Sequence, residues 1–88
     1  MIKVGVAEFR QHEYRMVRDF CPDGQNLQDT WEEHKTEVEK TLERFRLQGI
    51  TAVPVVLSLA TLMKFEADNG FGPDAGKRAR MASERVMA

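Results

Sequence analysis

The fold of this chain depends on residues 50–63, which read ITAVPVVLSLATLM. No side chain from Val55 to Met63 is charged, so a helix over this stretch would be apolar on every side. Helices of that kind are surrounded by protein. Thr51 can cap such a helix, and Pro54 can occupy its first turn, where a backbone N–H has no helical partner to lose. The pattern therefore predicts a buried central helix over residues 54–68.

The same stretch has a second interpretation as a strand. Residues 50–56 are rich in β-branched side chains, and Ile2, Val4 and Val6 alternate in the manner of a short strand. Pro54 argues against pairing of the two segments, because proline cannot donate a hydrogen bond to a strand ladder. An all-α fold is therefore the main prediction, and an α+β fold with a small N-terminal strand is the alternative.

The rest of the chain predicts three more helices, separated by turns. Apolar residues recur at helical spacing from residue 6 to residue 20 and again from Trp31 to Phe45. Pro22 and Gly24 mark the end of the first segment, and Asp29 or Thr30 can cap the second. We expect one domain over residues 1–88, a compact bundle with main helices over about 6–20, 30–48 and 54–68 and a short C-terminal helix over about 75–87.

The composition favours a protein of the cytoplasm. Thirteen basic and fourteen acidic residues give a formal net charge of −1, so the chain as a whole does not attract nucleic acid or an anionic membrane. Cys21 is the only cysteine, which excludes an intramolecular disulfide and favours a reducing compartment. The most apolar stretch is shorter than the roughly 20 residues that cross a bilayer, and the first residues lack the apolar core of a signal peptide.

The residue types that usually carry chemistry do not form a complete motif. The pair that starts at His12 is similar to the opening of a zinc-protease helix, but Met16 stands where the second histidine is needed. His34 and Glu37 can share a helix face and form half of a metal site, although both are ordinary on a solvated helix. Cys21 has no base fixed beside it by any motif. We therefore predict no catalytic, cofactor-binding or metal-binding residue, and a protein that is not an enzyme.

Protein binding fits more of the sequence. Residues 23–43 are rich in acids whereas the C-terminal tail is basic, and such a charge separation can steer a partner. Aromatic and methionine side chains exceed what so small a core must hold, and they are common interface anchors. The main functional prediction is a small non-catalytic protein–protein interaction module, an inhibitor, adaptor or assembly factor able to form homo-oligomers. Phages and plasmids make accessory proteins of this type against host machinery. The candidate partner-binding residues are Trp31, Glu33, Glu37, Tyr14 and Phe71.

The alternative function is a dimeric nucleic-acid-binding regulator that uses the basic C-terminal helix. A helix-turn-helix can be laid over residues 41–60, but its recognition helix would start at Pro54. The first ten residues of that helix contain no Lys, Arg, Asn or Gln to reach base edges. Phosphate contacts would therefore have to come from the C-terminal helix, and the candidates are Lys77, Arg78, Arg80 and Arg85.

Overall fold

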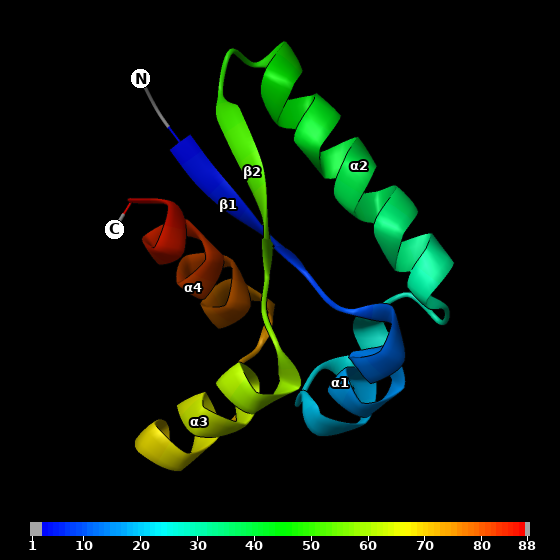
Figure 1. Ribbon diagram of the computed structural model, residues 1–88, viewed down its shortest axis with the longest axis vertical. Helices are drawn as coiled ribbons and strands as arrows, with labels where there is room; N and C mark the ends of the chain where they lie inside the picture. The colour runs from blue at the N-terminus through cyan, green and yellow to red at the C-terminus, as the bar shows by residue number, and fades with distance from the viewer. Residues whose placement is uncertain (1–2, 88) are drawn as a thin grey trace.

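The protein is described by a computed structural model that covers residues 3–87. Within that range, two parallel strands form a small sheet, and α2 and α4 lie on opposite sides of it (Figure 1). The shorter helices α1 and α3 lie beyond the carboxyl ends of the strands (Figure 1). The elements are β1 (Lys3–Glu8), α1 (Tyr14–Phe20), α2 (Trp31–Leu47), β2 (Thr51–Val56), α3 (Leu59–Asn69) and α4 (Ala75–Met87), with 3-10 turns at Gln11–Glu13 and Gly24–Asn26.

The all-α prediction is wrong, because residues 51–56 form a strand instead of the start of a helix. β2 pairs in parallel with β1, and Pro54 lies opposite Val6. The N–H of Leu57 donates to the carbonyl of Glu8 over 2.9 Å. Since strand residues alternate, this bond places the backbone of residues 53 and 55 toward β1 and that of Pro54 on the outer edge. Proline therefore costs the ladder nothing there, and the fold is α+β.

The prediction of a helix over residues 6–20 is also wrong in its first half. The chain is extended through Glu8, and α1 begins only at Tyr14. Pairing with β2 outweighs the helical spacing that Val6 and Phe9 share with α1. The predicted strand included Ile2, which lies outside the described residues. The predicted helices over 30–48 and 75–87 match α2 and α4 to within a residue.

Side chains of both flanking helices close the outer edge of β1. From α4, the hydroxyl of Ser83 accepts the N–H of Gly5 (3.2 Å). From α2, the Nε2 atom of His34 accepts the N–H of Phe9 (3.1 Å), and the indole N–H of Trp31 donates to the Phe9 carbonyl (2.8 Å). A Cβ atom on Gly5 would lie 2.2 Å from the carbonyl oxygen of Ala82, so only glycine allows α4 this close.

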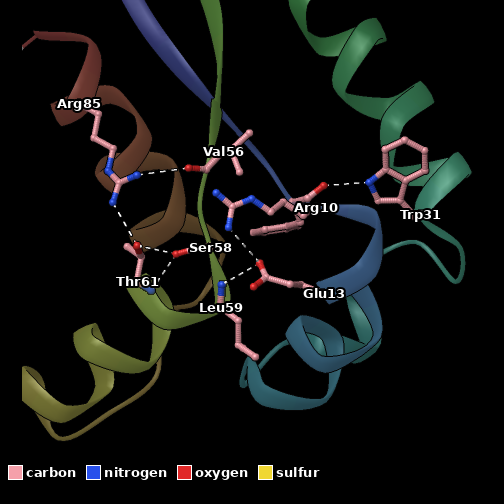
Figure 2. A network of polar contacts seen from close by, with 9 residues as sticks. Arg10, Glu13, Trp31, Val56, Ser58, Leu59, Thr61 and Arg85 are labelled. Atoms are coloured by element: carbon pink, nitrogen blue, oxygen red, sulfur yellow. Dashed lines mark hydrogen bonds and ion pairs between the residues drawn. The ribbon is translucent and has the colours of Figure 1, made fainter.

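The outer edge of β2 is protected in a different way. Pro54 offers no N–H to an incoming strand, and the Arg85 guanidinium donates to the Val56 carbonyl (3.2 Å) and to the Thr61 hydroxyl (3.3 Å), as Figure 2 shows. Unpaired strand edges promote association between chains, and prolines and charged side chains on the edge suppress it. Pro54 and the hydrogen bonds of Arg85 therefore help this two-stranded sheet to avoid pairing with another chain.

The expectation of a helix shielded on every side is wrong as well. Leu57 is fully buried, but it follows β2 directly, and α3 buries only Leu62. The α3 helix starts where the Ser58 hydroxyl accepts the Thr61 N–H (3.1 Å) and the Glu13 carboxylate accepts the Leu59 N–H (3.2 Å; Figure 2).

Among the helices of residues 3–87, none has the length and apolarity needed to cross a membrane. The main buried cluster consists of Phe9, Tyr14, Val17, Cys21, Leu57 and Leu62, and Val38 and Ala82 are buried as well.

Candidate protein-binding surface

Two of the predicted partner-binding residues take part in the protein's own packing, Tyr14 as a buried residue and Trp31 as a partly buried one. Tyr14 is 3% exposed, and its hydroxyl donates to the carbonyl of Gln28 (2.7 Å). Burial is the main cause that raises the pKa of its phenol. Trp31 packs against the core while its indole N–H holds the Phe9 carbonyl. In this structure Tyr14 joins α1 to the loop before α2, and Trp31 joins α2 to the residue that follows β1.

The two predicted acidic residues lie at the surface of α2. Glu33 takes part in the N-terminal cap, because its N–H donates to the Thr30 hydroxyl (3.1 Å). Glu37 accepts a hydrogen bond from Arg44 (3.1 Å). The acidic face of α2 is therefore partly offset by basic side chains from the same helix.

The four basic residues of the alternative function do not share one free surface. Arg78 is 4% exposed, and its guanidinium donates to both carboxylate oxygens of Asp23 (2.6 and 3.0 Å) and to the Pro73 carbonyl (2.9 Å). Arg85 is bound to the end of β2 as described above. The other two form exposed ion pairs, Lys77 with Asp74 (3.3 Å) and Arg80 with Glu84 (3.0 Å). Of the four, Arg78 is thus directed into the protein.

His34 is buried, although its sequence context is also ordinary for a solvated helix face. It is 4% exposed, and its ring stacks on Phe9 and Tyr14, with centroids 5.0 and 5.1 Å apart. Burial is the main cause that lowers the pKa of its imidazole. Its spacing after Trp31 and before Val38 continues the apolar stripe of α2, which was the available signal. No group of three or more metal-ligating side chains occurs among the residues that the structure describes.

Phe71 lies at the surface, in a hollow of about 360 Å³ between α3 and α4. We call this hollow the Phe71 groove. The ring of Phe71 is half exposed and meets the ring of Phe65 edge-on, with 5.8 Å between the ring centroids. The ammonium of Lys77 lies 5.2 Å from the centre of the Phe71 ring. The groove is lined by Phe65, Asn69, Phe71, Lys77, Arg80, Met81 and Glu84.

The local sequence fixes the position of Phe71 from both sides. Gly70 ends α3 in the left-handed conformation (φ 80°), and its N–H donates to the Glu66 carbonyl (2.8 Å). Asp74 then accepts the N–H of Lys77 (3.0 Å) at the start of α4. With a cap on each side, the loop from residue 71 to residue 73 is short and well defined, and it presents the aromatic ring without a long flexible segment.

Comparisons with known proteins add no relative. No family model, no curated protein and no solved structure matches this chain. The geometry of the described residues is therefore the basis for a functional proposal, and the Phe71 groove is the surface where aromatic, methionine and cationic side chains meet.

Proposed function

We propose that this chain is a small non-catalytic protein-interaction module whose partner docks in the Phe71 groove. The observation that supports the proposal is the half-exposed ring of Phe71, held at the surface beside Phe65 and Lys77. Aromatic residues are enriched among the anchors that carry most of the binding energy at protein interfaces. An aromatic side chain that stays half exposed on a small protein has apolar surface area left to bury against a partner.

The groove is suited to binding because little of it needs to be ordered first. Phe71 is fixed by the caps at Gly70 and Asp74, so its position is already set before a partner arrives. Met81, on the wall formed by α4, has a flexible side chain that adapts to different apolar shapes. Binding therefore combines one rigid anchor with one adaptable wall.

The charges around the groove define the kind of partner. Its lining contains the cations Lys77 and Arg80 and one carboxylate, Glu84. The side chains of Lys77 and Arg80 are 40% and 81% exposed, and exposed ion pairs such as Lys77–Asp74 and Arg80–Glu84 hold their partners weakly. The proposed occupant is a protein segment that inserts an apolar side chain beside Phe71 and places acidic side chains near the two cations. Action by binding alone corresponds to an inhibitor, adaptor or assembly factor, and we propose a cytoplasmic one.

The test compares two side chains of equal exposure. Phe71 is 50% exposed and lines the groove, whereas Met63 is 51% exposed on α3 and does not line it. A protein captured from lysate by the wild type is purified, and its affinity is measured by calorimetry for wild type, Phe71→Ala and Met63→Ala. An anchor worth about 2 kcal/mol raises the Kd about 30-fold. We expect that increase for Phe71→Ala and less than a threefold change for Met63→Ala.

Further variants test the chemistry of the occupant. The double substitution Lys77→Glu and Arg80→Glu is expected to weaken binding further, and the wild-type affinity is expected to fall as salt is added. Equal losses for Phe71→Ala and Met63→Ala would show that the partner binds elsewhere. If light scattering finds a dimer of the wild type that Phe71→Ala dissociates, the occupant is a second copy of this chain and the acidic partner is ruled out.

A further inference from the structure

His34 joins α2 to the outer edge of β1 through a single acceptor atom. Its Nε2 atom accepts the N–H of Phe9 over 3.1 Å, which requires the neutral imidazole with a lone pair on Nε2. The neighbouring carbonyl of Phe9 accepts the indole N–H of Trp31, from the first turn of the same helix. Both backbone groups of Phe9 are thus bonded to side chains of α2, and the His34 ring is buried against the rings of Phe9 and Tyr14.

Protonation of His34 removes this acceptor. Both ring nitrogens of an imidazolium are donors, so Nε2–H and the N–H of Phe9 would face each other with no lone pair between them. A buried donor without an acceptor is costly, and so is a charge buried beside the rings of Phe9 and Tyr14 away from water. The chain relieves both costs if α2 moves away from β1 at this point and lets the ring reach solvent.

The charged groups around His34 act in opposite directions, and burial outweighs them. Arg78 of α4 and Lys35 of α2 both oppose a further positive charge. Glu8 of β1 favours it, but the side chain of Glu8 already accepts a hydrogen bond from Lys35. Tyr14, from α1, contributes an aromatic ring and a hydroxyl that is committed to the Gln28 carbonyl. Burial remains the largest influence, and it too favours the neutral ring.

We infer that His34 is an acid-sensitive latch that holds α2 against the outer edge of β1 when neutral and opens this edge at Phe9 when protonated. The direction of the pH dependence follows from the linkage between protonation of His34 and opening of the latch. The pKa of His34 is lowered in the closed protein, whereas a released histidine titrates near about 6.5. The latch is therefore fully closed above that value and loosens as the pH falls toward the pKa of the closed state. The Phe71 groove lies between other elements, so this inference does not depend on the proposed function.

The experiment measures hydrogen exchange at the Phe9 amide between pH 7 and pH 5. Between the pKa of the released ring and that of the buried ring, each pH unit favours the open state about tenfold. We expect the protection factor of the Phe9 N–H to fall below about pH 6.5, by at most about tenfold per pH unit and only as far as the lowered pKa of the closed state. The indole N–H of Trp31, the only tryptophan, should lose protection in parallel.

Two substitutions separate His34 from general acid effects. In His34→Gln the amide oxygen can accept the Phe9 N–H but does not titrate, so the pH dependence should disappear. The other histidine, His12, is exposed, and His12→Gln should retain the wild-type profile. An unchanged slope in His34→Gln, or constant protection of Phe9 in the wild type, would overturn the inference. If His34→Gln does not fold, the test uses His12→Gln, in which His34 is the only remaining histidine. The imidazole signal of His34 must then titrate over the same pH range in which Phe9 loses protection. Titration of His34 without that loss contradicts the latch.

Discussion

Replacing Asp23 with asparagine removes the counter-charge of a guanidinium buried in the protein. Arg78 is 4% exposed and donates three hydrogen bonds, two to the Asp23 carboxylate (2.6 and 3.0 Å) and one to the Pro73 carbonyl (2.9 Å). In Asp23→Asn the shape is kept, but one carboxylate acceptor becomes an NH₂ group that repels the guanidinium. The charge of Arg78 then remains in the interior without a partner of opposite sign.

The expected loss of stability is about 3 kcal/mol. Removing one partner of a buried ion pair costs about 3–5 kcal/mol, and the lower end applies because the Asp23 side chain is 21% exposed. Such a loss lowers the ratio of folded to unfolded protein about 150-fold. Since domains of this kind have a total stability of about 5–15 kcal/mol, the variant stays folded at room temperature but with a much smaller margin.

The assay is urea unfolding at pH 7, followed by the fluorescence of Trp31, with Asp74→Asn as the matched control. Asp74 forms an exposed ion pair with Lys77, and asparagine can still cap α4, so the control should barely move the midpoint. Hydrogen bonding from Arg78 is the main cause that lowers the pKa of Asp23. The stability from this pair is therefore present above the ordinary carboxyl value of 3.8 and is lost as the pH falls through the lower pKa of the folded protein.

Two results would refute the reasoning about Asp23. One is a midpoint for Asp23→Asn that shifts no further than that of Asp74→Asn, which would mean that the Arg78 charge finds water or another acceptor. The other is a difference between wild type and Asp23→Asn that stays constant below pH 3.8. The His34 latch begins to loosen below about pH 6.5, whereas this ion pair weakens only below pH 3.8, so the two contributions begin at different pH values.

Two further substitutions test the packing of α4 and the start of α2. Gly5→Ala places a Cβ atom 2.2 Å from the Ala82 carbonyl oxygen, and thermal unfolding should show a loss of about 1–3 kcal/mol or more. The control Gly76→Ala meets its nearest atom at 3.6 Å and should instead stabilise α4 by up to about 1 kcal/mol, so equal losses in both variants would contradict the close-approach argument. Thr30→Ala removes the hydroxyl that accepts the Glu33 N–H and should cost about 1 kcal/mol in urea unfolding, whereas Thr30→Ser should cost little; no difference between them would exclude a capping role.

Local signals in the sequence determined the two long helices. α2 begins at Thr30, one of the two predicted caps, and carries its acids in the first turn and its bases in the last. α4 spans the predicted range 75–87. These signals act within a few residues, so a single sequence contains them completely. The turn that holds Phe71, between Gly70 and Gly72, separates α3 from α4, and the half-exposed setting of Phe71 depends on how these two helices pack.

Tertiary contacts decided the strands and the surroundings of the buried polar side chains. Residues 51–56 by themselves are compatible with a helix or a strand. They form a strand because β1, near the N-terminal end of the described chain, supplies the backbone partners of the ladder. Pro54 is compatible with that ladder only because its backbone faces the outer edge. Arg78 is buried because Asp23, 55 residues away in the sequence, neutralises it, and His34 is buried because the Phe9 N–H needs an acceptor. Hydrogen bonds between distant residues have no local signal in the sequence, since each exists only after the chain has brought its two groups together.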